Sequence, residues 1–362
     1  MKKVEKKLRR VVSRIHYKLL LPTLSLSFFC VLLALYDEEI LKQIEVGNVA
    51  AWVKTIENLA TPILSFFDFG LVKALAVMLF TSLLLLTLCK VFLRPKAIVI
   101  SHSSFSNTQA PYDQKAVSNY LVAHKDINLV DKMKRHDFVD AIRTQDRLVS
   151  EITNKCDEFT QLFYYGIAHI PLIVRAGYQI GNEGTVRLLH KFRNDQSLFK
   201  ELSSESDDYR INIAKRLTPR NLLADELLVV IATSLEVTDA DLAILRKSNI
   251  KYELNFHIAD ASMYDFDVLS AYATMTRLRT VVMAEIRKQV KKENINRIHL
   301  VLATSSDFAF YLAQDFSATH DPEIITYHYE SSSNVKYPWG ISNKLPPATA
   351  TVILRDTTEN VN

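Results

Sequence analysis

A strand–turn–helix–strand pattern that occurs twice is the feature that most constrains the fold of this chain. In the first copy, an apolar and aromatic strand covers residues 162–168, and Pro171 stands where it can occupy the first turn of a helix. The helix is expected to end at Gly181, and a second strand to cover residues 185–192. This order of elements is a β-α-β unit.

The same pattern returns about 135 residues further along the chain. We expect a strand over residues 298–303, a turn over 304–307, a helix over 308–316 and a closing strand over 324–329. Two related units in one chain predict two similar α/β halves that face each other.

Two long uncharged runs precede these units. Residues 19–36 contain no charged side chain, and their helix would span about 27 Å, enough to cross the core of a bilayer. The second run is uncharged over residues 74–89, and its span extends over residues 70–93, because Lys73 and Lys90 can reach the interfaces. We therefore expect an α-helical transmembrane hairpin in residues 1–96. A cleaved signal peptide is disfavoured, because acidic residues 37–39 follow the first run directly.

The charge differs between the two parts of the chain. Residues 1–96 carry 14 Lys and Arg and 7 Asp and Glu, and basic residues flank the predicted spans. The positive-inside rule then places both the N-terminus and the C-terminal domain in the cytoplasm. Residues 97–362 carry 30 basic and 33 acidic residues, so no DNA or RNA polymer is expected as a partner. A local site for a small anion is compatible with this charge.

Hydrophobic periodicity predicts further elements around the repeated units. Helices are expected at residues 116–124, 138–154, 239–247 and 265–292, and strands at 97–101, 127–130, 226–233 and 251–257. Residues 200–219 are expected to form a polar linker, and residues 348–354 an edge strand.

Sequence motifs for catalysis and metal binding are weak. No P-loop, GxGxxG or GxSxG pattern occurs, and the three cysteines indicate no disulfide framework. The ten histidines are scattered without an HExxH motif, and no Cys-x-x-Cys pair occurs, which argues against a zinc site. We expect no catalytic residue, no metal ion and no cofactor.

Small polar residues follow four of the predicted strands. In open α/β sheets, ligands bind outside the carboxyl ends of strands, and helix N-termini favour phosphate. We expect ligand-binding residues at these ends, namely His102, Ser103, Ser104, His169, Ser234, Thr304, Ser305 and Ser306. For each hydroxyl alone, capping of the next helix is the alternative role.

Further side chains complete the predicted site. Lys191 and Arg193, at the end of a strand, can neutralise a phosphate, with a solvated sheet edge as their alternative role, and Tyr329 and Trp339 offer planar faces for a base. Trp339 is placed in a Pro-Gly loop and is the preferred stacking residue, whereas Tyr327 is expected to pack in the core.

The segments IAHIPL and IHLVLATSSDFAFYLAQ, followed by YHYE and YPWGISN, resemble the SAVED domain. The resemblance covers residues 97–362 and implies two fused CARF-like, Rossmann-like halves at about residues 97–200 and 220–362. SAVED domains are sensors in bacterial anti-phage systems of the CBASS type, and they bind cyclic oligonucleotides. With two predicted spans in front, the chain is similar to SAVED effectors that carry two transmembrane helices.

The resemblance implies an anti-phage effector. We expect a multi-pass protein of the bacterial inner membrane whose cytoplasmic domain binds a cyclic di- or trinucleotide. It is then expected to form homo-oligomers and to disrupt the lipid bilayer, without enzymatic activity. The alternative, from another class, is a membrane-tethered α/β hydrolase or nucleotide-processing enzyme that uses His102 or His169.

Overall fold

The computed structural model describes residues 82, 95–106, 110–157, 159–181, 186–193, 198–203, 212–343 and 352–354. The chain forms two compact units, residues 1–94 and 95–362. Apart from the helical Ser82, both predicted transmembrane spans lie outside the described residues. Within the described part of the chain, no helix is both long enough and apolar enough to cross a membrane.

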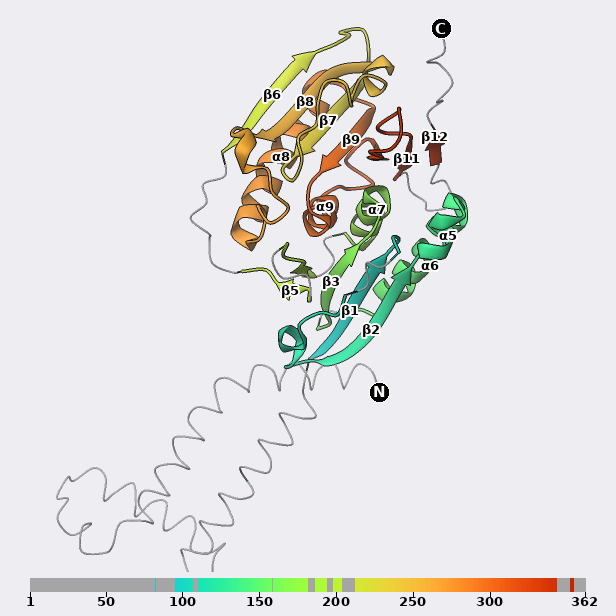
Figure 1. Ribbon diagram of the computed structural model, residues 1–362, viewed down its shortest axis with the longest axis vertical. Coiled ribbons are helices and arrows are strands. Elements are labelled where there is room, and N and C mark those ends of the chain that lie inside the picture. The colour runs from blue at the N-terminus through green and yellow to red at the C-terminus, as the bar shows by residue number, and fades with distance from the viewer. Residues whose placement is uncertain are drawn as a thin grey trace, which may run out of the picture. The chain divides into compact units, whose positions relative to one another are not determined.

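The first half of the second unit is built on a five-stranded sheet. The strand order is β2-β1-β3-β4-β5, with β5 antiparallel to β4 and the others parallel (Figure 1). The strands are β1 (Lys96–Ser103), β2 (Leu121–Asn128), β3 (Gln161–Ile167), β4 (Val186–His190) and β5 (Lys200–Glu201). The helices are η1 (Gln114–Val117), α5 (Val130–Lys134), α6 (Phe138–Thr153) and α7 (Ile170–Ile180).

The second half is built on a seven-stranded sheet. Its order is β12-β11-β10-β9-β7-β8-β6, and the four strands β10, β9, β7 and β8 are parallel. The strands are β6 (Ile213–Pro219), β7 (Glu226–Ala232), β8 (Ile250–Ile258), β9 (Arg297–Ala303), β10 (Glu323–His328), β11 (Trp339–Ser342) and β12 (Val352–Leu354). The helices are η2 (Leu245–Lys247), η3 (Ala261–Met263), α8 (Tyr272–Glu293) and α9 (Ser306–Ala313).

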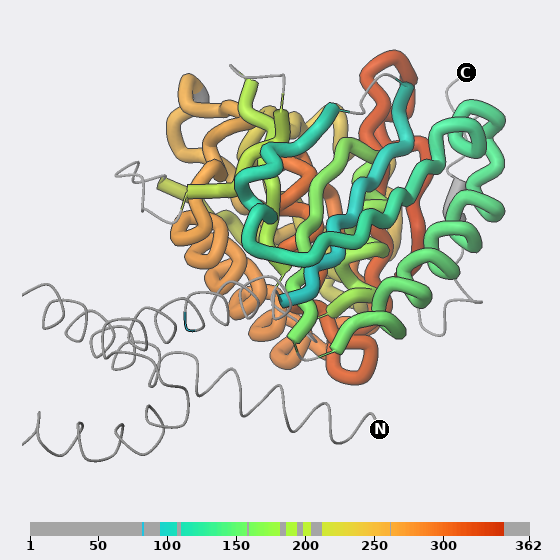
Figure 2. The backbone as a smooth tube through the Cα atoms, turned by 90° about the horizontal axis from the view of Figure 1, so that it is seen from below, coloured from blue at the N-terminus to red at the C-terminus, as the bar shows by residue number. Residues whose placement is uncertain are grey.

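The two halves meet where α7 packs against α9 (Figure 1). Gly177 of α7 makes this close approach possible, because a Cβ atom there would lie 2.4 Å from the carbonyl oxygen of Phe310. The ring of Tyr164 on β3 stacks on Phe310 at a centroid distance of 3.7 Å. One apolar core therefore runs through both halves. Figure 2 shows the first-half strands in front, between α8 and the pair α5 and α6.

The predicted duplication is confirmed. The units β3-α7-β4 and β9-α9-β10 have the expected order, and each helix starts just after its first strand ends. The predicted helix at 138–154 and the strands at 226–233 and 251–257 also form. The predicted strand at 348–354 corresponds to β12, which pairs with β11 at the sheet edge.

The prediction of a helix over residues 116–124 is wrong. Only η1 is helical, and the next residues form β2, which pairs in parallel with β1 along its full length. β2 therefore replaces the strand predicted at 127–130 and ends at Asn128. Pairing with a neighbouring strand outweighs the helix-like spacing of these residues.

Three other segments differ from the sequence-based expectation. The helix predicted over residues 265–292 begins only at Tyr272, because the backbone on either side of Ala271 bonds to Ser203 instead. Of residues 239–247, only η2 is helical. The predicted linker over residues 200–219 contains β5 and β6, and β6 pairs with β8.

Candidate functional site

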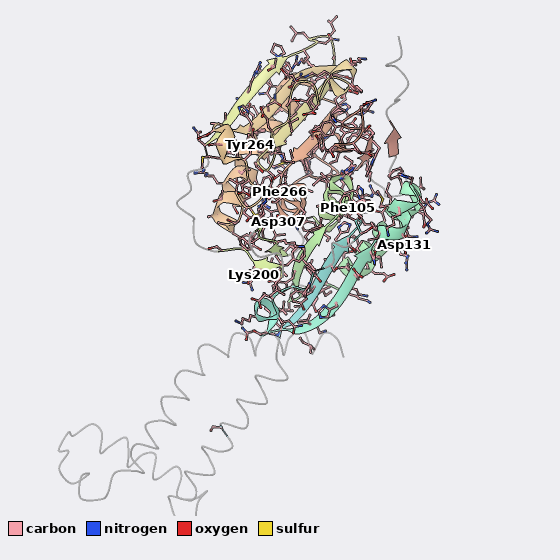
Figure 3. The ribbon with its side chains drawn as sticks, viewed as in Figure 1. Phe105, Asp131, Lys200, Tyr264, Phe266 and Asp307 are labelled. Carbon is pink, nitrogen blue, oxygen red and sulfur yellow. The ribbon has the colours of Figure 1, made fainter. Side chains whose placement is uncertain are left out.

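The carboxyl ends of β3, β4 and β9 converge on one pocket at the seam between the halves. Its volume is about 430 Å³. The first half contributes Ile167, Ala168, Ile170 and residues 190–193, and the second half contributes Phe266 and residues 304–307. Figure 3 shows Phe266 and Asp307 at the level where α7 meets α9. The pocket thus brings together Lys191, Thr304, Ser305 and Ser306 of the predicted site.

The N-terminus of α9 faces this pocket. Ser305 occupies the N-cap position, but its side chain makes no capping hydrogen bond. Its Oγ is buried and has no hydrogen-bond partner among the described residues. Because the first N–H groups of a helix also lack intrahelical partners, this end offers several donors to an anion. Ser306 serves a different role, since its Oγ donates to the Gly166 carbonyl across the seam at 2.8 Å.

Two more serines at strand ends have buried hydroxyls without a partner among the described residues. They are Ser103 at the end of β1 and Ser234 after β7. Thr233 and Thr304, by contrast, bond to each other at 2.7 Å, which joins the ends of β7 and β9. Unsatisfied buried polar groups are rare in folded proteins, so these hydroxyls are candidate contacts for a polar ligand.

A charged histidine lies beside the pocket. His190 Nδ1 lies 2.9 Å from Asp307 Oδ2, and its Nε2 lies 3.2 Å from Asp267 Oδ1. Burial alone lowers the pKa of His190, but the two carboxylates outweigh it and raise the pKa to about 9. His190 is therefore an imidazolium at neutral pH, and it compensates the carboxylate of Asp307 at the start of α9.

Two cationic side chains complete this wall of the pocket. The Lys191 ammonium lies 5.7 Å from the centroid of Phe199, and the Arg193 guanidinium lies 5.4 Å from the centroid of Phe266. Both are long side chains on one short segment, and Phe266 is 40% exposed. This wall of the pocket therefore has cationic groups next to the accessible aromatic ring of Phe266.

His169 lies in a second cluster at the same end of β3. Ser104 Oγ accepts a hydrogen bond from the His169 backbone N–H at 2.7 Å and lies 2.6 Å from its Nδ1. Phe105 stacks on the His169 ring at 4.0 Å, and His328 and Trp339 contact its other sides. Burial lowers the pKa of His169 to about 3 and that of His328 to about 4, so both rings are neutral at pH 7.

Seven predicted site residues do not line the pocket: Ser103, Ser104, His169 and Ser234, described above, and also His102, Trp339 and Tyr329. His102 is buried in the core beside Tyr164, and burial lowers its pKa to about 3. Trp339 was expected in a loop, but it is the buried first residue of β11, because it pairs with His328 of β10. Tyr329 is exposed and contacts Tyr337 edge to face. Tyr327 packs in the core, as predicted.

Sequence reasoning missed His190, Phe266, Asp267 and Asp307. His190 lies near the end of the strand predicted over residues 185–192, as Lys191 does, so the rule that selected Lys191 also applies to it. Asp307 is the last residue of the turn predicted over residues 304–307, next to the selected residues 304–306. Phe266 and Asp267 carried no such signal, because their part of the chain was expected to be helical.

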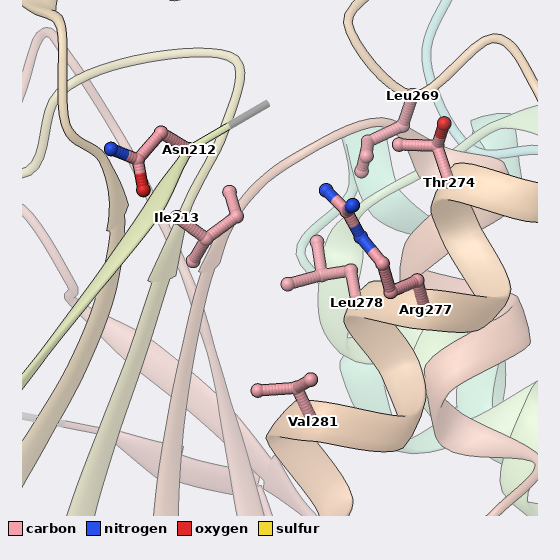
Figure 4. A pocket seen from close by; sticks show the side chains of 7 residues that line it. All are labelled: Asn212, Ile213, Leu269, Thr274, Arg277, Leu278 and Val281. Carbon is pink, nitrogen blue, oxygen red and sulfur yellow. The ribbon is translucent and has the colours of Figure 1, made fainter. Parts of the chain in front are cut away.

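A larger cavity lies elsewhere, between β6 and α8. Figure 4 shows Asn212 and Ile213 on one side and Arg277, Leu278 and Val281 on the other. Its volume is about 570 Å³. Four of its seven lining side chains are aliphatic, and it has no buried hydroxyl that lacks a hydrogen-bond partner among the described residues, which distinguishes it from the seam pocket with Ser305. Among the described residues, no group of three or more His, Cys, Asp or Glu is placed to hold a metal ion.

The fold defines a class of protein, an α/β domain with two related halves and a pocket at their seam. Residues 144–342, more than half of the chain, match the family described as "SMODS-associated and fused to various effectors sensor domain". The chain belongs to this family, SAVED.

Solved structures with a similar fold are receptors described as Cap4 SAVED/CARF-domain containing receptors. The Acinetobacter baumannii receptor with the cyclic trinucleotide 2′3′3′-cAAA is 14% identical, with a TM-score of 0.51, over 76% of this chain and 56% of that chain. The same receptor with 3′3′3′-cAAA is 14% identical, with a TM-score of 0.46, over 70% and 54%. The Moraxella osloensis receptor is 14% identical, with a TM-score of 0.37, over 66% and 48%.

At this identity the likeness concerns the fold alone. The chain spans about half the length of these receptors. No curated protein matches the sequence.

Proposed function

We propose that this protein is a sensor that binds a cyclic oligonucleotide messenger in the seam pocket. One observation carries the proposal. The pocket joins the α9 N-terminus and the unpartnered Ser305 hydroxyl of one half to Lys191 of the other. The Acinetobacter baumannii receptor of similar fold is described with a cyclic trinucleotide, which supports this class of ligand.

The pocket chemistry suits a phosphodiester joined to a base. A phosphate accepts hydrogen bonds from Ser305 Oγ and from the first N–H groups of α9, and Lys191 supplies the opposite charge. Phe266 offers a face on which a base can stack, in competition with Arg193. Asp307 does not repel the phosphate fully, because His190 compensates its charge. Such a site needs no generally basic surface, in agreement with the nearly balanced charge of residues 97–362.

The test is a binding experiment with recovery of the ligand. The full-length chain in detergent is dialysed against a panel of cyclic di- and trinucleotides, and bound material is released and analysed by chromatography. A sensor retains at least one member of the panel and returns it intact. Retention of none would contradict the proposal.

We further propose that the chain is an anti-phage effector anchored in the bacterial inner membrane. The support is the sequence of residues 1–96, which contains two apolar segments, 19–36 and 70–93, long enough to span a bilayer, and flanking basic residues that predict a cytoplasmic sensor domain. Two spans cannot enclose a water-filled path by themselves, so damage to the membrane requires many copies. Reporter fusions after Leu41 and after Lys96 test the topology, and an extracytoplasmic sensor domain would contradict it.

Assembly of copies would link ligand binding to the membrane. The two halves are similar but not identical, so contact between the first half of one copy and the second half of the next is heterologous and gives rings or filaments. A ligand that prefers the assembled state shifts a weak association toward it. Homo-oligomers would then gather the predicted spans at high local concentration and disrupt the bilayer.

A second candidate function is hydrolysis, and the contact between Ser104 and His169 favours it. A serine hydroxyl 2.6 Å from a neutral imidazole is the arrangement of a nucleophile and its base. Against it, the same Oγ accepts from the His169 backbone, and aromatic rings rather than a carboxylate surround the imidazole. Turnover of a recovered ligand that Ser104→Ala abolishes would favour this enzyme over the sensor.

A further inference from the structure

One carboxylate of the second half holds the segment of the first half that lines the pocket. Asp267 Oδ1 lies 3.2 Å from His190 Nε2. The Arg193 backbone N–H donates to both carboxylate oxygens of Asp267, at 3.1 and 2.9 Å. Asp267 therefore binds both ends of a four-residue segment, residues 190–193, and it does so across the seam.

The anchor itself is fixed in the second half. The Asp267 N–H donates to Asp265 Oδ1 at 3.2 Å, and Leu269, two residues further on, is only 1% exposed. Ser203 bonds to the backbone of Ser270 and Tyr272, which ties this irregular stretch to the start of α8. The backbone of Asp267 is therefore held in place, so its carboxylate can fix the positions of the residues to which it bonds.

A second carboxylate strengthens one end of the segment. His190 Nδ1 lies 2.9 Å from Asp307, in the first turn of α9, and both side chains are nearly fully buried. His190 is therefore held from two elements of the second half. Between His190 and Arg193 lie only Lys191 and Phe192, and a segment this short has little freedom once both ends are fixed.

The charges around His190 favour this arrangement. The groups that face its ring from other elements are Asp267 and Asp307, both acidic, and the ring of Phe192 packs on it edge to face at 4.8 Å. A ring nitrogen directed at each carboxylate requires both nitrogens to carry protons. The segment is then held by charge-assisted hydrogen bonds, which are stronger than neutral ones.

From this geometry we propose that Asp267 is the positioning residue of the seam pocket, holding residues 190–193 so that Lys191 lines it opposite Ser305. The inference rests on the proposed function, because it assigns Lys191 the role of a ligand contact. Asp267 need not touch the ligand. It acts through the backbone of residues 190–193, so the position of Lys191 in the first half depends on Asp267 in the second half.

A double-mutant cycle tests this role with the full-length chain in detergent. The affinity for 3′3′3′-cAAA and 2′3′3′-cAAA is measured for the wild type, Lys191→Ala, Asp267→Ala and the double variant. Each single variant is expected to bind about tenfold more weakly, the effect of losing one charged contact. The double variant is expected to bind no more weakly than Asp267→Ala alone. Independent losses that multiply to about a hundredfold would overturn the proposal.

Hydrogen exchange supplies a readout that needs no ligand. Asp267→Ala is expected to speed exchange in residues 190–193 and to leave the core strands β7 and β9 unchanged. Asp260→Ala is the matched control, since Asp260 bonds to Ser262 rather than to this segment. Unchanged exchange in residues 190–193 would overturn the proposal even if the ligand binds. If the wild type binds neither nucleotide, the proposed function fails for these probes, and the exchange result still decides whether Asp267 holds the segment.

Discussion

At the scale of single residues, Gly177 shows how closely the two halves approach. In an ordinary helix interior, Gly→Ala stabilises a protein by about 1 kcal/mol. Here a Cβ atom would lie 2.4 Å from the Phe310 carbonyl oxygen and 2.9 Å from the Ala313 Cβ. We therefore predict that Gly177→Ala lowers the free energy of unfolding by about 1–3 kcal/mol, measured by urea denaturation. A stabilised variant would show that α7 and α9 do not pack as described.

His190 is the residue for which we predict the clearest dependence of stability on pH. Its pKa is raised in the folded state, so the charged ring stabilises the fold fully below the ordinary value of 6.5, and this contribution is lost as the pH rises through about 9. We predict that the ring titrates near pH 9 by nuclear magnetic resonance. His169 and His328 serve as internal controls, because their lowered pKa values keep them neutral at pH 6.5. A midpoint near 6.5 for His190 would contradict its bonds to Asp267 and Asp307.

At the scale of elements, the start of α9 differs from that of an ordinary helix. Loss of a capping serine usually costs about 1 kcal/mol, but Ser305 makes no capping bond. We predict that Ser305→Ala changes the unfolding free energy little and weakens messenger binding about fivefold or more.

Asp137 at the start of α6 is the matched comparison for Ser305. Its carboxylate accepts from the Asp140 N–H at 3.1 Å, so Asp137→Ala should cost about 0.5–2 kcal/mol of stability without affecting binding. Thermal unfolding and calorimetry of both variants check the contrast. An equal loss of stability in the two would mean that Ser305 is only a cap.

The elements that could be predicted from the sequence are those with a strong local pattern. β3, β7 and β9 are rich in apolar residues because both faces of their sheets are covered, and the duplicated turns mark the helices that follow. β2 was missed, since it is an edge strand with several exposed side chains whose order resembles a helix.

The site was predictable only in part, for a similar reason. Hydroxyls at strand ends can be found from the chain, because the carboxyl ends of parallel strands share one edge. The hydrogen bonds of Asp267 to His190 and Arg193 join residues more than 70 positions apart, so no local sequence pattern predicts them. Trp339 was misplaced because pairing of β11 with β10 decides its burial, and its Pro-Gly setting suggests a loop.

At the scale of the whole molecule, the proposal that binding drives assembly can be tested directly. We predict that the full-length chain in detergent changes from small species to large oligomers when its cyclic oligonucleotide is added, as measured by light scattering. In liposomes the same ligand should release a trapped dye. Dye release by a protein that binds tightly and stays monomeric would contradict assembly as the cause of membrane damage.

The central claim is that a cyclic oligonucleotide binds at the seam between the two halves. Isothermal titration calorimetry of the full-length chain with a cyclic trinucleotide, compared with Ser305→Trp, tests it most directly. The tryptophan would fill the pocket beside Lys191 and Thr304. The account predicts saturable binding by the wild type and none by the variant, with both proteins unfolding at similar temperatures. Binding of equal affinity in a folded Ser305→Trp variant would place the ligand elsewhere and contradict the account.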